Sequence, residues 1–331
     1  MRDLHLQQLR LNQTQRVRLQ TALQKLQDVS PSSAAATVAV ADNIPVNHED
    51  GVLKGHGTSE LDGQVVATLC GVVERVNKLV YVRTLRARYK PEIGDIIVGR
   101  VIEVATKHWR LEINFSQDAV LMLSSMNLPD GIQRRRTATD ELNMRSIFEE
   151  NDVICAEVRG FQHDGSLHLQ ARSLKYGKLK SGQLLTVPPY LIKRRKQHFH
   201  HLENYGVDLI LGCNGFIWIG EHVETSNGVM EGDGGNKVEE SNESSSHSVP
   251  LGEKGQRLMS LETRQHICQI ANAVRVLSTL GFSLTTEGIL EAAKASISLG
   301  INTKDMLGAE FHVQTAEREV GRRMSLLRKK G

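Results

Sequence analysis

The feature that most constrains the fold is an Asn-Gly pair, Asn214-Gly215, between two apolar runs in the stretch YGVDLILGCNGFIWIG. Asparagine and glycine both tolerate positive φ, and such a pair between two apolar runs is the strongest short-range signal for a β-hairpin. The sequence therefore predicts two paired strands, at residues 207–211 and 216–219.

The same turn contains the sequence GCNG, which fits the GxxG loop that clamps nucleotides in KH domains. That loop joins two helices, whereas the flanks here are short, rich in β-forming residues and bounded by glycine. We therefore interpret the match as part of a hairpin turn, with a nucleotide-clamping loop as the alternative. Because side chains alternate along a strand, we expect Ile217 and Ile219 on one face and Phe216 and Trp218 on the other.

Length and composition limit the classes of protein to which this chain can belong. Its 331 residues give room for about two or three domains. The four cysteines are far apart and share no CxxC spacing, so we expect neither a zinc site nor a disulfide framework, and a reducing compartment fits best. No apolar run approaches the ~18 residues of a membrane span and the polar start has no secretory signal, so we expect a soluble intracellular protein without a membrane partner.

The N-terminal part of the chain changes from helical to β character. Residues 1–36 form an extension with leucines at amphipathic spacing, which predicts a partly helical structure. From residue 37 short β runs alternate with turn-forming pairs, which predicts a small β domain over 37–88. This domain carries little positive charge, so its surface suits a protein interface better than a polyanion. Its candidate docking turn consists of Gly55, His56, Gly57 and Thr58, with a purely structural turn and a solvated His56 as the alternative.

Five further β runs fall within residues 89–174. They lie at 95–104, 109–115, 119–123, 152–158 and 166–171. Five short strands in one block of this size predict a small Greek-key barrel of the OB type, a fold that often binds oligonucleotides on one face. An OB barrel kept purely as an assembly scaffold is the alternative, because a fold alone does not fix function.

Basic residues are clustered, although the net charge is only +3. An arginine run in the long stretch 124–150 can lie along phosphates, or instead stay solvated or pair with a protein partner. A lysine and a tryptophan at the preceding strand turn could stack a base, although a lone tryptophan is more often core. A second basic run is expected in a short helix entered at Pro188-Pro189. The candidate RNA-binding residues are Lys107, Trp109, Arg134, Arg135, Arg136, Lys193, Arg194, Arg195 and Lys196.

The last domain, 175–331, combines the hairpin with helices and is therefore expected to be α+β. Within it, residues 223–256 are acidic and nearly free of large apolar side chains, so we expect a disordered insertion. Three helices follow, expected from Ser260 to Gly281, from Thr285 to Gly300, and from Thr303 into the basic C-terminal tail.

A catalytic set is not evident in the sequence. There is no P-loop, no GxSxG motif and no group of neighbouring Asp and Glu residues of the two-metal type. His198, His200 and His201 are close together, but no cysteine or carboxylate cluster is near them in sequence to complete a metal site. We therefore expect a partly exposed histidine patch, no metal or other cofactor, and no enzyme activity. The exclusion is weaker for a phosphorolytic nuclease, because its phosphate site shows poorly in sequence.

Six stretches of the chain resemble a single known family. They are GHGT at 55–58, VERVNKLVYVR at 73–83, YKPEIGDIIVGRV at 89–101, LSSMNLPDG at 123–131, RSLKYGKL at 172–179 and GCNGFIWIG at 212–220. These motifs are similar to those of the exosome RNA-binding subunits called ribosomal-RNA-processing protein four. The resemblance implies a multidomain, mainly β protein with α+β content. Its expected order is an N-terminal β domain, an OB-fold barrel of the S-one RNA-binding type and a C-terminal KH-type domain.

The resemblance also implies a non-catalytic cap subunit of the RNA exosome. Such a subunit docks through its N-terminal β domain on a ring of RNase PH-like proteins, beside other cap subunits. It guides single-stranded RNA, with low sequence preference, to 3′–5′ exoribonucleases in ribosomal RNA processing and RNA decay. The implied locations are the nucleus, the nucleolus and the cytoplasm. Archaeal relatives keep a GxxG loop in the KH domain, but the matching stretch here, 194–197, has no glycine, so the basic side chains and the barrel are the better RNA-binding candidates.

Two functions of other classes are kept as alternatives. An active RNA-processing enzyme would degrade RNA as a purified protein. A translation-associated RNA-binding protein that uses the OB barrel would co-sediment with ribosomes instead of entering a ring complex.

Overall fold

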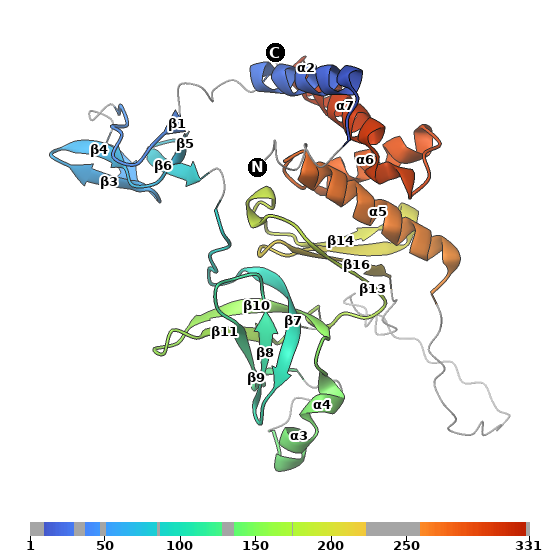
Figure 1. Ribbon diagram of the computed structural model, residues 1–331. Coiled ribbons are helices and arrows are strands. Elements are labelled where there is room, and N and C mark those ends of the chain that lie inside the picture. Colours follow the sequence, from blue (N-terminus) through green and yellow to red (C-terminus); the bar gives the residue numbers. More distant parts are fainter. Residues whose placement is uncertain are drawn as a thin grey trace, which may run out of the picture.

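The computed structural model describes residues 10–29, 37–46, 51–84, 87–127, 136–173, 175–222 and 259–328. Three β-rich units and a layer of helices make up this part of the chain (Figure 1). The predicted fold class, mainly β with a C-terminal α+β domain, is confirmed. The predicted insertion at 223–256 lies outside the described residues. In the described part of the chain, no helix is both long and apolar enough to cross a membrane.

The N-terminal β domain is built from short strands around a small core. One sheet has the order β1 (Thr37–Val38), β5 (Gly71–Val76), β6 (Leu79–Thr84), β2 (Leu53–Lys54), and β3 (Thr58–Leu61) pairs with β4 (Gln64–Ala67). The buried core holds Ile44, Val65, Ala67, Val80 and Val82. Large aliphatic side chains that stay exposed in this domain are Val40, Leu53, Leu61, Leu69, Val76 and Leu79.

The predicted OB barrel is confirmed. Its strands are β7 (Ile96–Val104), β8 (His108–Glu112), β9 (Ala119–Met126), β10 (Val153–Phe161) and β11 (Leu167–Ala171). They lie in the order β11-β9-β8-β7-β10, and pairing of β10 with β11 closes the barrel. A short strand, β12 (Gly177–Lys178), also pairs with β10, and helices α3 (Ala138–Leu142) and α4 (Met144–Ile147) lie between β9 and β10.

The C-terminal sheet contains the predicted hairpin. Its strand order is β13 (Gly182–Thr186), β16 (Phe216–Glu221), β15 (Val207–Leu211), β14 (Phe199–Leu202). Strands β15 and β16 pair antiparallel, so the hairpin is confirmed and a GxxG loop between two helices is wrong. The turn differs from the expectation in one respect, because Gly215 has a φ of +90° but Asn214 does not have positive φ. Asn214 is instead fully buried, and its side-chain amide donates to the carbonyls of Val98 and Ile113 in the barrel at 2.7 and 2.9 Å.

The two faces of this sheet pack against different partners. Ile217 and Ile219 lie in the core shared with the helices, whereas Phe216 and Trp218 pack with Val98 of the barrel. The predicted alternation is therefore confirmed. Because both faces are covered, the strands consist of nearly continuous apolar runs. The sheet thus joins the barrel on one side to the helical layer on the other (Figure 1).

The helical layer consists of α5 (Leu261–Thr279), α6 (Thr286–Ser298) and α7 (Ala309–Arg328). The first two begin as predicted, since the hydroxyls of Ser260 and Thr285 accept hydrogen bonds from backbone N–H groups three residues on, at 3.0 and 3.1 Å. The third begins at Ala309 and not at the predicted Thr303. The reason is a separate 3-10 turn, η4 (Asp305–Leu307), that precedes it.

The N-terminal helix, α2 (Gln13–Val29), lies beside α7 (Figure 1). Leu19 and Ala22 are buried in the core that α5, α6 and α7 share with the sheet. Arg18 forms ion pairs with Glu310 and Glu317 at 2.9 and 2.7 Å. The helical part of the predicted N-terminal extension is therefore confirmed as a helix, and it belongs structurally to the C-terminal domain.

The predicted basic helix after Pro188-Pro189 is wrong. Only a single 3-10 turn forms, η2 (Pro189–Leu191), and residues 193–198 are irregular up to β14. A bridge between Ile192 and Leu284 holds the chain in extended conformation at this point. The four basic residues 193–196 therefore form a loop, called the basic loop below.

Candidate nucleic-acid interface

Trp109 cannot stack on a base, so its prediction as an RNA-binding residue is wrong. Its side chain is fully buried in the barrel, and the indole Nε1 donates to the carbonyl of Phe148 at 3.2 Å. The Phe148 ring meets the indole edge to face at 5.1 Å between centroids. Strand alternation explains this position, because Trp109 and Leu111 point inward on β8 while Arg110 points out.

Three candidate RNA-binding arginines, Arg134, Arg135 and Arg136, lie in the long stretch between β9 and β10. Arg134 and Arg135 lie outside the described residues. The Arg136 guanidinium donates to the carbonyl of Leu123 at 3.2 Å and to that of Met126, so it ties the loop to strand β9. Arg136 is half-buried in this arrangement, and its phosphate contact stays a prediction.

Lys107 remains on the surface. Its side chain is 65% exposed and its ammonium lies 3.5 Å from a carboxylate oxygen of Glu141. An exposed pair of this kind contributes at most about 1 kcal/mol, so an approaching phosphate can replace the carboxylate. Lys107 therefore stays a candidate for contact with RNA phosphates, but the buried Trp109 cannot act beside it as a stacking partner.

Arg194 connects two domains. It donates to both carboxylate oxygens of Asp95 in the barrel, at 2.8 and 3.1 Å, and to the carbonyl of Lys90 at 2.7 Å. Asp95 also accepts from the Tyr89 hydroxyl and from the backbone N–H of Glu92, both at 3.0 Å. Burial by itself raises the pKa of the Asp95 carboxyl, but these hydrogen bonds outweigh it and hold the pKa below its ordinary value. Arg194 therefore uses its fork of donors to hold the barrel, and its RNA contact stays a prediction.

Lys193, Arg195 and Lys196 are the open part of the basic loop. They are exposed, and their side chains form no hydrogen bond or ion pair with any residue that the structure describes. Hydrogen bonds from neighbouring side chains lower the pKa of Glu74 on β5, and the charge of Lys193 lowers it further. The basic loop therefore lies close to both the barrel and the N-terminal β domain. A cation without a partner in the protein can contact a phosphate without breaking any interaction within the protein.

Lys90 is a residue that the sequence analysis missed. Its carbonyl accepts the bond from Arg194 across 104 positions in sequence, and its own side chain is exposed. The tertiary structure thereby places another cation beside the basic loop. Lys90 closely follows Arg86 and Arg88 in sequence, but only the fold shows that Lys90 lies beside the basic loop.

The GHGT motif forms a tight turn against β6. Gly57 has a φ of +75°, and a side chain at Gly55 would bring a Cβ within 2.8 Å of Tyr81. The hydroxyl of Thr58 donates to the carbonyl of Gly55 at 2.8 Å. His56 is exposed at the tip. The turn therefore leaves His56 open to solvent, and its role in docking stays a prediction.

One buried pair resembles a catalytic dyad in composition. The Sγ of Cys213 lies 3.7 Å from Nε2 of His198, and both side chains are buried between the barrel and the C-terminal sheet. Burial raises the pKa of the Cys213 thiol to about 12, so it stays protonated at neutral pH. A protonated, buried thiol is a poor nucleophile, and the pair therefore has a packing role.

The histidine patch has a partner that the sequence did not reveal. His201 lies beside Asp208 and His222, and one ligand atom from each of the three side chains lies within 4.8 Å of the others. Asp208 lies seven positions after His201 and His222 fourteen positions after Asp208, and pairing of the strands brings the three together. The sequence analysis did not foresee this carboxylate, and its expectation of no metal stays a prediction.

A closed OB barrel docked on an α+β domain, with an open basic loop at their junction, defines a multidomain nucleic-acid-binding protein. Family models match the same two units. The model described as "RRP4, S1 domain" matches residues 88–160, and the model described as "KH domain" matches residues 182–225. Both kinds of domain are RNA-binding modules.

Sequence identity to individual proteins shows the family to which the chain belongs. The chain is 63% identical over 323 residues to the Exosome complex component RRP4 homolog of Arabidopsis thaliana, a match that spans 97% of this chain and 98% of that protein. It is 42% identical over 266 residues to Exosome complex component RRP4 of Bos taurus, spanning 80% of this chain and 83% of that protein. It is 38% identical over 261 residues to Exosome complex component RRP4 of Saccharomyces cerevisiae, spanning 74% of this chain and 72% of that protein. The chain therefore belongs to the RRP4 family of exosome complex components, and the resemblance inferred from its motifs is confirmed.

Proposed function

We propose that this chain is a non-catalytic cap subunit that sits on the RNase PH-like ring of an RNA exosome. In this role it guides single-stranded RNA to separate 3′–5′ exonucleases in ribosomal RNA processing and RNA decay. The observation that carries the proposal is the junction of the barrel and the C-terminal sheet. Arg194 and Asn214 lock the two units together there, and the remaining cations of the basic loop stay open.

RNA is expected to follow the basic loop. Lys193, Arg195 and Lys196, with Lys90 beside them, offer several positive charges that the protein does not neutralise itself. Charges of this kind bind the phosphate backbone without reading bases, so the sequence preference is expected to be low. Lys107 follows the end of β7 opposite to Asp95, beside Glu141 of α3, and is a separate candidate contact on the barrel.

Docking is assigned to the N-terminal β domain. Its exposed aliphatic side chains, with exposed fractions such as 63% for Leu53 and for Leu61, are numerous for a domain with so small a core. A contiguous exposed apolar patch marks a protein interface, and the proposal is that these side chains form one. The partners would be RNase PH-like ring proteins, with His56 at the tip of its turn beside them.

RNA cleavage by the chain itself is not expected. Among the described residues, the group with a metal-binding composition is His201, Asp208 and His222, which lacks the several carboxylates of a two-metal nuclease. Cys213, the buried thiol beside His198, stays protonated. The purified chain should therefore bind RNA without shortening it, and degradation by the isolated chain would favour the enzyme alternative.

Reconstitution with RNase PH-like ring proteins tests the docking role. Leu53→Glu combined with Leu61→Glu should abolish entry into the ring complex, since two charges would be buried at the interface. Leu142→Glu is the matched control, because Leu142 is 84% exposed on helix α3 of the barrel. If the double variant still enters the complex stoichiometrically, docking through this domain is wrong.

The RNA role has a separate test in the same complex. Lys193→Ala, Arg195→Ala and Lys196→Ala together should assemble normally but deliver RNA poorly. The control removes three other exposed lysines, Lys25, Lys294 and Lys304, which lie on the helical side of the molecule. Equal delivery by both triple variants would count against the basic loop as the RNA track.

We also propose that the protein acts in the nucleus, the nucleolus and the cytoplasm, where ribosomal RNA processing and RNA decay take place. Fluorescent tagging of the full chain tests this. Complete absence from the nucleolus would contradict the part of the proposal that concerns ribosomal RNA.

A further inference from the structure

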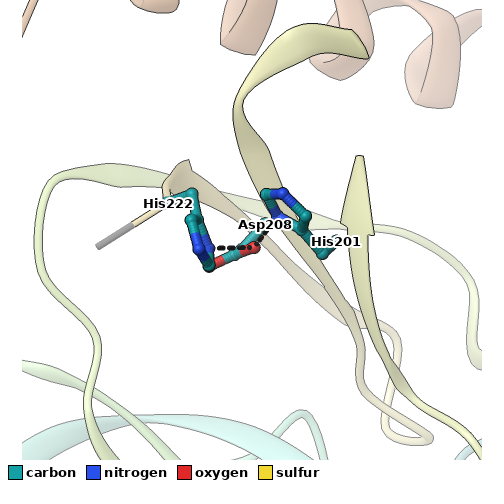
Figure 2. A group of neighbouring side chains, drawn as sticks. All are labelled: His201, Asp208 and His222. Atoms are coloured by element: carbon teal, nitrogen blue, oxygen red, sulfur yellow. Dashed lines mark hydrogen bonds and ion pairs between the residues drawn. The ribbon is translucent and has the colours of Figure 1, made fainter. Parts of the chain in front are cut away.

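Three side chains, those of His201, Asp208 and His222, meet on one face of the C-terminal sheet (Figure 2). His201 lies on β14 opposite Asp208 on β15, and Asp208 lies opposite Gly220 on β16. His222 follows two residues after Gly220 and so points to the same face. Strand register therefore fixes all three positions.

The two imidazoles share one carboxylate. Nδ1 of His201 lies 2.7 Å from Oδ1 of Asp208, and Nδ1 of His222 lies 3.0 and 2.9 Å from its two oxygens. The two rings are 4.0 Å apart between centroids. All three side chains are between 37% and 38% exposed, so an ion can reach them from solvent.

We propose that His201, Asp208 and His222 bind one divalent transition-metal ion of the Zn²⁺ type. Two imidazole nitrogens and one carboxylate oxygen are a ligand set that such ions accept, with a fourth position left for water. Ligands at ~2.0–2.1 Å from a tetrahedral zinc ion are about 3.3 Å apart, so the distances from each Nδ1 to the Asp208 oxygens need to open by only about half an ångström. Imidazole donors select Zn²⁺, Ni²⁺ or Cu²⁺ over Mg²⁺ and Ca²⁺.

Binding requires a proton rearrangement within each histidine. Where a neutral imidazole donates Nδ1–H to Asp208, its lone pair is on Nε2, so the proton must move to Nε2 before Nδ1 can coordinate. The exposed ring edge allows Nε2–H to donate to water. A neutral histidine therefore releases no net proton when the ion binds. The ion then occupies the space between the imidazoles and the carboxylate in which the Nδ1 protons lay before.

The bound ion would have a structural role. It would join the edge strand β14 to its neighbour β15 and to the residue at which the chain leaves β16. A cross-link between strands opposes fraying of the sheet edge, so binding should stabilise the folded chain. This role does not depend on RNA binding or on the exosome, and its test therefore succeeds or fails independently of the proposed function.

The test uses the purified full chain, freed of metal with a chelator and then titrated with Zn²⁺ or Co²⁺. We expect one equivalent of tightly bound ion, a higher melting temperature with Zn²⁺, and no response to Mg²⁺. The near-ultraviolet spectrum of the Co²⁺ form should lack thiolate charge-transfer bands, which separates this site from the exposed Cys70 and Cys268.

Variants complete the test. His201→Gln combined with His222→Gln should weaken Zn²⁺ binding by about 100-fold or more and remove the thermal shift, and Asp208→Asn should weaken it by at least about 10-fold. His163→Gln is the matched control, since His163 is exposed in the turn between β10 and β11. Because the three positions are partly exposed, the metal-free variants should melt like the wild-type chain. Unchanged Zn²⁺ affinity in the double variant, or no stoichiometric binding by the wild type, would overturn the proposal.

Discussion

Arg194→Ala tests how the barrel and the C-terminal sheet are held together. Asp95 is almost completely buried, with 5% of its side chain exposed, while 46% of the Arg194 side chain is exposed. Removing one partner of a buried ion pair costs about 3–5 kcal/mol, because the other charge is left without compensation. Water can enter the space left by the half-exposed arginine, so we expect a smaller loss of about 2–3 kcal/mol in the free energy of unfolding at pH 7. This loss corresponds to roughly 30- to 150-fold in the unfolding equilibrium.

The same substitution should change the dependence of stability on pH. In the wild type the pKa of Asp95 is below its ordinary value, so its contribution is fully present above about pH 3.9 and is lost as the pH falls through the folded-state pKa. Without Arg194, only the hydrogen bonds from Tyr89 and from the Glu92 N–H oppose the effect of burial, so we expect the Asp95 pKa to rise above its unfolded value. Protonation then favours the folded variant, so its deficit relative to wild type should shrink between pH 7 and pH 5.

Urea unfolding at both pH values measures this effect. Intrinsic fluorescence reports on both units, since Trp109 lies in the barrel and Trp218 in the C-terminal sheet, both buried. Arg195→Ala is the matched control and should change stability by less than about 0.5 kcal/mol, because its side chain has no partner among the described residues. The stability of Arg194→Lys should lie between those of the wild type and Arg194→Ala, because lysine keeps the charge but cannot donate two parallel hydrogen bonds to the carboxylate. An Arg194→Ala variant as stable as the Arg195→Ala variant, or a deficit independent of pH, would refute the reasoning.

Three further predictions concern RNA binding and the hairpin turn. Trp109→Phe should lower stability and leave RNA affinity within about twofold of wild type, since the indole is core; a selective loss of RNA binding in filter assays would contradict this. Replacing Lys193, Arg195 and Lys196 with alanine should reduce the salt slope of log K by about 2, at ~0.7 per phosphate contact on single strands, and an unchanged slope would exclude these contacts. Asn214→Ala should cost about 2–3 kcal/mol in urea unfolding, because it leaves two buried barrel carbonyls without their side-chain donors; a neutral effect would show that the turn does not anchor the barrel.

Local features were predictable because their causes lie within a few residues. The caps at Ser260 and Thr285 depend on a hydroxyl and an N–H three positions on, and both formed as expected. The five barrel strands and the hairpin followed from short apolar runs and a glycine that takes positive φ. Family motifs added the order of the domains, which the barrel and the two matched family models bear out.

Only the tertiary structure decided what each polar residue near the candidate site does. Arg194 and Lys193 are neighbours in sequence, yet one binds a carboxylate 99 positions away and the other is open to solvent. Asn214 was read as a turn residue, but its amide is bound inside the barrel more than 100 positions away. His201, Asp208 and His222 meet because three strands pair in one register. A pattern in sequence carries the local preferences of the backbone, whereas the partner of a charge depends on which distant surfaces the packed core brings together.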